Sequence, residues 1–425
     1  MNVSEFNLDE QSGKVYVEYD NGTGVEKDLA HAITGKLNTT TGVVTLDDAS
    51  KRSVDSALFK RTPKLRKLYA AIAKVLSGQG QCFIGLIDDS TGVGAGAGTG
   101  GKGLLNARPG APLAHLASLL TSMGIPAAED SWMGEHLMEA FNSTLMSAYD
   151  TRFSVGASAT YYTNGAFQTL GGLPFRLSSA GKSVSFTPTN QADTAKIFYA
   201  NRFGGTFDTT FAGGASLGTT VATGATTIGS VTKTFTRGSG ALTNSWVSGD
   251  NAILGAICYD STTPRVNLVN LSCYGDKLTS NNGYANNTNA DFRGGAALSV
   301  LGLDAVIVGM TVNSENQDGL AGVDAYKLAL IKVCNDVVAA GSDLILSTPH
   351  NIGTAPQTSG ICDAYVAAIR EVAAQFDAPL IDLYQRLDSY STFNALGLYF
   401  DTLHLTTIGY RAKAQEFARV LNVWS

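Results

Sequence analysis

One serine and one carboxylate–histidine pair are the residues of this sequence best suited to chemistry. Ser90 comes shortly after an apolar run, and Asp401 stands three positions before His404. A serine hydroxyl is a weak nucleophile until a base removes its proton. A histidine acts as that base when a carboxylate fixes its tautomer and stabilises the imidazolium. These residues predict a hydrolytic triad in which Ser90 is the nucleophile, His404 the base and Asp401 its partner.

The segments around these residues predict a parallel β-sheet. Short apolar runs alternate with segments of helical periodicity, a pattern typical of a sheet with helices on both faces. Ser90 follows the first run, at the carboxyl end of a strand, where open parallel sheets place their sites. The expected strands are 83–87, 266–271, 305–308, 344–346 and 380–383, and the main helices 323–340, 359–376 and 407–421.

The middle of the chain has a different character. From about residue 151 to 260 it is rich in Thr, Ser, Gly and aromatic residues, with period-two alternation as in 205–211. Many short strands separated by turns predict a jelly-roll-like β-sandwich, inserted between the first two strands of the parallel sheet. We therefore divide the chain into an N-terminal arm and helical linker (1–76), a first core segment (77–150), a carbohydrate-binding-like insert (151–261) and a second core segment (262–425).

Composition and charge exclude several classes of function. The 425 residues carry a formal charge of −6, which argues against a nucleic-acid partner. No apolar run approaches the roughly 18–20 residues of a membrane span, and the polar N-terminus lacks the apolar region of a secretory signal. The five cysteines have no Cys-x-x-Cys spacing and are expected to be buried thiols. We expect neither a metal nor a cofactor.

Four segments resemble, in order, the sequence blocks of SGNH, or GDSL-type, esterases. The first matches Gly-Asp-Ser-x-x-x-Gly, with Asp88 in place of the usual first glycine. The third normally reads Gly-x-Asn-Asp, and here Thr311 and Ser314 replace its glycine and aspartate. The fourth matches closely. The segments are 88–94, 270–276, 306–314 and 401–404.

The resemblance implies a fold and a set of roles. The fold would be a flavodoxin-like three-layer α/β/α core, and the triad would be Ser90, His404 and Asp401. The oxyanion hole would consist of the Ser90 N–H, the Gly275 N–H and the Asn313 side-chain amide. The activity implied is that of a carboxylic ester hydrolase.

The insert and the N-terminal arm suggest a substrate and a setting. Threonine-rich sandwiches with aromatic residues often bind sugars, and similar inserts occur in carbohydrate-active SGNH enzymes. We therefore predict acetylesterase-like O-deacetylation of a polysaccharide. The polar, strand-like arm and the absence of a signal resemble bacteriophage tail proteins. This favours a tail-fibre or tailspike deacetylase, assembled as a homotrimer with other virion tail proteins and acting outside the cell after lysis.

Three other interpretations stay open. The chain could be a glycan-binding adhesin with an inactive hydrolase core, or a general carboxylesterase or lipase. Residues 98–103 also satisfy a dinucleotide-binding pattern and nearly form a phosphate-binding loop. That loop lacks its magnesium-binding Ser or Thr and begins well beyond the strand. The glycines between Gly92 and Gly96 are instead expected to let the backbone approach a ligand closely.

Overall fold

The structure is a computed structural model of the chain, and it forms two units, Met1–Pro63 and Lys64–Ser425. It describes residues 65–136, 146–156, 169–280 and 293–421, with the backbone of six further strands. The smaller unit contains a three-stranded antiparallel sheet and a two-stranded hairpin. Its strands are β1 (Val3–Asp9), β2 (Lys14–Tyr19), β3 (Gly24–Asp28), β4 (Lys36–Asn38) and β5 (Val43–Thr45).

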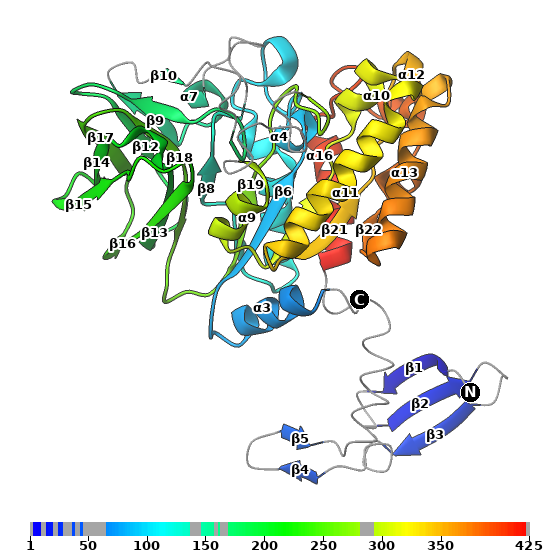
Figure 1. Ribbon diagram of the computed structural model, residues 1–425. Helices are drawn as coiled ribbons and strands as arrows, with labels where there is room; N and C mark the ends of the chain where they lie inside the picture. Colours follow the sequence, from blue (N-terminus) through cyan, green and yellow to red (C-terminus); the bar gives the residue numbers. More distant parts are fainter. Residues whose placement is uncertain are drawn as a thin grey trace. The chain divides into compact units, whose positions relative to one another are not determined.

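The larger unit is built on a six-stranded parallel sheet with the order β22-β21-β20-β6-β19-β7 (Figure 1). Without the short edge strand β7, this is the 2-1-3-4-5 order of flavodoxin-like folds, and the order reverses between β6 and β20. The expected strands are thus confirmed. They are β6 (Cys82–Ile87), β7 (Ala127–Ala128), β19 (Val266–Asn270), β20 (Ala305–Val308), β21 (Asp343–Ser347) and β22 (Leu380–Ile381).

Helices cover both faces of this sheet. In β20, Val306 and Val308 pack against one helical layer, while Ala305 and Ile307 pack against the other. Because both faces are buried, the strands are apolar throughout. One layer contains α9 (Gly295–Leu301), α11 (Val323–Ala339) and α13 (Ile361–Phe376), and the other α3 (Arg66–Leu76), α5 (Pro112–Ser122) and α16 (Thr407–Leu421).

Helix α3 falls inside the segment 1–76 that we assigned to an arm and linker. Its buried residues Leu68, Ile72 and Val75 pack with the strands of the parallel sheet. The helix is therefore a structural part of the core layer. Short helical segments complete the unit: α4 (Ser90–Val93), α7 (Met146–Tyr149), α10 (Val312–Asp318), α12 (Ala355–Thr358), α14 (Leu383–Arg386), α15 (Tyr390–Ala395), and the 3₁₀ turns at 101–103, 108–110, 201–203 and 320–322. None of the helices described is both long and apolar enough to cross a membrane.

The insert is a sandwich of two antiparallel sheets. Eight successive strands are divided between the sheets, in the orders β11-β18-β13-β16 and β12-β17-β14-β15, which is a jelly-roll arrangement. Strands β8 and β10 extend the first sheet, and β9 extends the second. The strands are β8 (Ser131–Met133), β9 (Phe153–Gly156), β10 (Thr160–Tyr161), β11 (Phe175–Leu177), β12 (Ser183–Phe186), β13 (Ala192–Ala200), β14 (Thr206–Phe211), β15 (Ser216–Val221), β16 (Ile228–Gly238), β17 (Leu242–Ser248) and β18 (Asn251–Tyr259).

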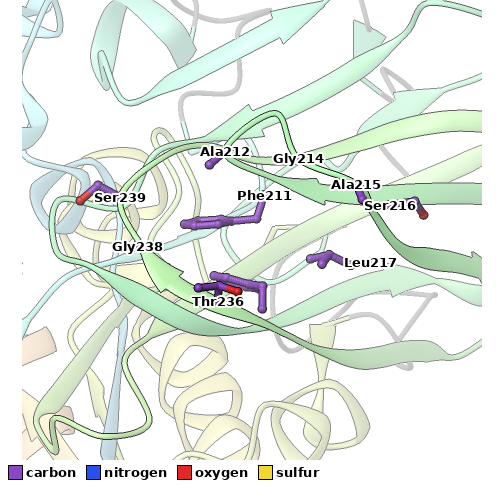
Figure 2. Close-up of a pocket in the computed structure, with 10 residues that line it drawn as sticks. Phe211, Ala212, Gly214, Ala215, Ser216, Leu217, Thr236, Gly238 and Ser239 are labelled. Atoms are coloured by element: carbon purple, nitrogen blue, oxygen red, sulfur yellow. The ribbon is translucent and has the colours of Figure 1, made fainter.

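Period-two alternation explains the core of the sandwich. In β14, Phe207, Thr209 and Phe211 are buried while the residues between them are half-exposed. At the end of this strand, Phe211 stacks on Phe235 of β16, with ring centroids 4.0 Å apart. A hollow of about 440 Å³ is lined by these rings. Hydroxyl-bearing side chains such as Ser216 and Ser239 also line it (Figure 2).

Candidate active site

The turn after β6 positions Ser90 at the carboxyl edge of the parallel sheet, beside the reversal of strand order. Asp89 precedes α4 and caps it, because its carboxylate accepts a hydrogen bond from the Thr91 N–H at 2.9 Å. Ser90 is the first residue of that helix and is 3% exposed. The sheet topology thus puts the predicted nucleophile where open α/β sheets bind ligands.

The three residues predicted as a triad lie together. Ser90 Oγ is 2.9 Å from His404 Nε2, and His404 Nδ1 is 2.8 Å from Asp401 Oδ2. The other oxygen, Asp401 Oδ1, accepts the backbone N–H groups of Leu403 and His404, both at 2.7 Å. With the Nδ1 proton donated to the carboxylate, Nε2 is free to accept the serine proton.

Asp401 is held in its ionised form. Partial burial alone would raise the pKa of its carboxyl, but the hydrogen bonds from the His404 ring and from two backbone amides lower that pKa to about 2. The carboxylate therefore stays charged over the ordinary pH range and can stabilise an imidazolium.

His350 supports the backbone segment that carries His404. His350 is buried, and its Nε2 lies 2.8 Å from the carbonyl oxygen of Leu403. Burial, with the nearby Lys413 ammonium, lowers the pKa of His350 to about 3, so the ring is neutral and donates its single proton to that carbonyl. His350 thus fixes the backbone beside His404.

The glycines after Ser90 approach protein atoms, which corrects our expectation that they approach a ligand. A Cβ at Gly92 would come within 2.4 Å of both Asp88 Cβ and Ser272 Oγ, and one at Gly94 within 2.6 Å of Ala111 Cβ. A Cβ at Gly96 would lie 2.5 Å from the Leu405 carbonyl oxygen. Only glycine lets this loop lie against the segment that follows His404.

The groups expected to bind the oxyanion are also near this edge. Gly275 lies in an exposed turn after β19, with φ of +73°. Among the described residues, the N–H groups of Ser90 and Gly275 donate no hydrogen bond. Asn313, at the start of α10, donates one N–H of its amide to the Asp276 carbonyl at 2.9 Å. That bond orients the amide and leaves its second N–H for a ligand.

Asp89 ties the nucleophile turn to the helix that carries Asn313. Its Oδ2 accepts the Val312 N–H at 3.0 Å, while Oδ1 caps α4. Burial and the adjacent Asp88 carboxylate raise the pKa of Asp89 to about 6, although hydrogen bonds from Thr91 and the Lys413 charge oppose the rise. This carboxylate therefore connects the first and third blocks physically.

Two buried ion pairs lie beneath the site. Asp88, 1% exposed, accepts a hydrogen bond at 2.8 Å from Lys413 of α16, which is 3% exposed and also contacts Thr91 Oγ1 at 3.0 Å. Asp276, next to Gly275, pairs with the fully buried Arg293. Each pair supports a turn that carries a candidate site residue.

An aromatic side chain flanks the histidine. The Tyr274 ring stacks on the His404 ring, with centroids 6.1 Å apart and planes 22° from parallel. Lys102 Nζ in turn lies 5.2 Å from the centroid of the Tyr274 ring. Tyr274 lies within the second block, but nothing in the spacing of the sequence indicates this stacking.

The described residues contain no candidate metal-binding site. No group of three or more His, Cys, Asp or Glu side chains there could hold a metal ion. All five cysteines are buried and free, as expected from their scattered positions.

Comparison with known proteins establishes the fold. No family model matches the sequence, and no curated protein matches it. A solved peptidoglycan O-acetylesterase structure matches with a TM-score of 0.58 and 15% identity, over 85% of this chain and 95% of that one. The predicted α/β core with an inserted β-domain is thus confirmed. At this identity the likeness shows the fold alone.

Two further matches are weaker. An acetyl xylan esterase has a TM-score of 0.30 and 19% identity, over 37% of this chain and 82% of that one. A family two carbohydrate esterase from Clostridium thermocellum, in complex with cellohexaose, has a TM-score of 0.30 and 10% identity, over 63% of this chain and 98% of that one. These two scores are too low to support an argument.

Proposed function

We propose that this protein is a serine esterase that removes acetyl groups from a polysaccharide. The observation that carries the proposal is the unbroken chain of hydrogen bonds from Ser90 Oγ through the His404 ring to Asp401. It lies at the edge of the sheet where α/β enzymes bind their substrates. The same three residues were expected from spacing and from the resemblance to SGNH esterases.

The geometry supports a two-step acyl transfer. In the first step His404 Nε2 takes the proton of Ser90 as Oγ attacks the ester carbonyl carbon. The carbonyl oxygen becomes an oxyanion, which the N–H groups of Ser90 and Gly275 and the amide of Asn313 would stabilise. His404 then gives its proton to the departing sugar oxygen, and the acetyl group stays on Ser90.

The second step repeats the chemistry with water. His404 removes a proton from a water molecule, whose oxygen attacks the acetyl carbonyl carbon. The bond to Ser90 Oγ breaks, His404 returns the proton to Oγ, and acetate leaves. Asp401, ionised because its pKa is about 2, stabilises the imidazolium that forms in both steps.

A glycan substrate is supported by the insert and by the fold comparison. The hollow in the jelly roll combines a phenyl floor, Phe211 and Phe235, with a rim of serine and threonine hydroxyls. Such surfaces suit the apolar face and the hydroxyls of a sugar ring. The protein with the matching fold is a peptidoglycan O-acetylesterase.

The test is hydrolysis of p-nitrophenyl acetate and p-nitrophenyl octanoate by the wild type, Ser90→Ala and His404→Ala. We expect acetate turnover in the wild type, a weak octanoate rate, and a loss of about 10³-fold or more in each variant with an unchanged circular dichroism spectrum. Activity within about tenfold of the wild type in either variant would contradict the triad.

The alternatives predict other outcomes of the same test. A general carboxylesterase or lipase would hydrolyse octanoate at least as fast as acetate. An inactive adhesin would turn over neither ester, while its binding to a glycan array would survive Ser90→Ala. Thr311 and Ser314, which replace the usual glycine and aspartate of the third block, are both buried. Thr311 Oγ1 lies 2.8 Å from the Tyr326 hydroxyl, so packing accounts for the threonine.

The bacteriophage setting stays a prediction. It concerns the arm, whose side chains lie outside the described residues, and virion partners. Light scattering of the full chain tests the expected homotrimer, and a monomer would remove the tail-fibre assembly from the proposal.

A further inference from the structure

We propose that Glu315 is a positioning residue for the oxyanion donor Asn313, and that the site works only while this buried carboxyl is neutral. The inference rests on the proposed esterase function and adds a residue that belongs neither to the triad nor to the oxyanion hole. It follows from the contacts of α10 with the segments that carry the triad and from the burial of Glu315 without a cation.

Helix α10 contacts the segments on both sides of the site. Its first N–H, that of Val312, donates to the Asp89 carboxylate at 3.0 Å, directly before Ser90. The Val312 side chain belongs to a small buried cluster against which Leu403 packs, and Leu403 directly precedes His404. A displacement of α10 would therefore move the oxyanion donor and disturb both of these contacts together.

Glu315 lies on the buried side of this helix. It is 1% exposed, and neither of its carboxyl oxygens reaches a hydrogen-bond partner among the described residues. The Cys362 thiol, near the start of α13, lies beside it. A carboxylate in this place would lose its hydration without a compensating bond, whereas a neutral carboxyl costs much less to bury.

Among the described residues, none of the ionisable groups that face Glu315 is a cation. The Cys362 thiol and the Tyr365 hydroxyl face it from α13, and the Tyr326 hydroxyl faces it from α11. The fourth group is the Asp89 carboxylate, which repels a second negative charge. The other segments that pack against α10 are α12 and the 3₁₀ turn that follows α10, and neither contains an ionisable side chain.

The carboxyl of Glu315 is therefore neutral at pH 7 and ionised at higher pH. Burial raises its pKa to about 8, and the Asp89 charge adds to the rise while the Cys362 thiol opposes it. Ionisation places an unpaired charge in the core, which a movement of α10 toward water would relieve. The same movement would take the Asn313 amide away from the Asp276 carbonyl that orients it at 2.9 Å. The oxyanion would then lose one of its three donors.

The experiment is the pH dependence of kcat for p-nitrophenyl acetate in the wild type and in Glu315→Gln. The wild-type kcat should fall about tenfold from pH 7 to pH 9, in step with the neutral fraction of the carboxyl, while KM changes little. Glutamine has the shape of the neutral carboxyl but does not ionise. Glu315→Gln should therefore retain the wild-type kcat at pH 7 and lose less than about twofold at pH 9. The circular dichroism spectrum of both proteins should be the same at the two pH values.

The matched control is Glu371→Gln. Glu371 is on α13, and its side chain is 63% exposed and paired with Lys327. This variant removes an exposed carboxyl from a helix that packs against α10, and it should keep the wild-type fall in kcat.

Three results would overturn the inference: a wild-type kcat that does not fall, a fall that persists in Glu315→Gln, or loss of the wild-type spectrum at pH 9, which would show global unfolding. A wild type that hydrolyses no p-nitrophenyl acetate at any pH would instead refute the esterase proposal itself.

Discussion

Replacing Lys413 by methionine tests the support beneath the nucleophile. The change removes the cation from a fully buried pair and leaves Asp88 uncompensated, beside Asp89. Breaking a buried pair in this way costs about 3–5 kcal/mol of unfolding free energy, because the remaining charge stays desolvated. Asp88→Asn combined with Lys413→Met removes both charges. We therefore expect the loss of unfolding free energy in the double variant to be smaller than the sum of the two single losses by at least about 1 kcal/mol.

The assay is urea unfolding of the full chain, followed by circular dichroism. Lys332→Met is the matched control, because Lys332 pairs with Asp336 at 2.9 Å on the exposed surface and should cost under about 1 kcal/mol. The pH dependence is a further check. Asp89, with a pKa raised to about 6, is ionised above that pH and protonated below it, so the cost of Lys413→Met should be larger at pH 8 than at pH 5. If the buried pair supports the turn, Lys413→Met must cost more than about 1 kcal/mol of unfolding free energy. A smaller cost, or strictly additive effects of Asp88→Asn and Lys413→Met, would refute that role.

Two other predictions concern the oxyanion and acid stability. Asn313→Ala should lower kcat for p-nitrophenyl acetate by about 10²–10³-fold with little change in KM. Asn316→Ala, in the same helix, is the control and should keep a kcat near that of the wild type. Equal losses of kcat in the two variants would contradict an oxyanion role for Asn313. The pKa of His350 is about 3 in the folded chain and about 6.5 in the unfolded chain. Its contribution to the free energy of unfolding is therefore intact above pH 6.5, and below that it falls by about 1.4 kcal/mol for each pH unit. His350→Gln should therefore flatten the acid limb of a plot of Tm against pH, and an unchanged limb would contradict this assignment.

The features that could be predicted from sequence are those that local pattern encodes. The apolar runs that became β6, β20 and β21 are buried on both faces, so their composition alone identifies them. The period-two alternation of β14 is equally local. Asp401 and His404 lie within one turn, so their spacing already indicates that they can interact.

The features that could not be predicted depend on contacts between distant segments. Lys413 contacts Asp88, 325 positions earlier in the chain, and His350 contacts the Leu403 carbonyl. Nothing in the spacing of these residues indicates their partners. The glycines after Ser90 were misinterpreted for a similar reason, because the close approach they permit is to protein atoms such as those of Ala111 and Leu405, which the spacing does not indicate.

Contacts between distant segments account for two of the three departures from the SGNH blocks, Asp88 and Thr311. A carboxylate at position 88, where the resemblance expects glycine, would be a buried, unpaired charge if Lys413 did not reach it from α16. Thr311, in place of another glycine, bonds to the Tyr326 hydroxyl. Both departures thus alter how the turns are supported and leave the Ser90–His404 hydrogen bond intact at 2.9 Å. Each of these two side chains has a partner in the folded chain, so neither replacement leaves a buried polar group unpaired at these turns.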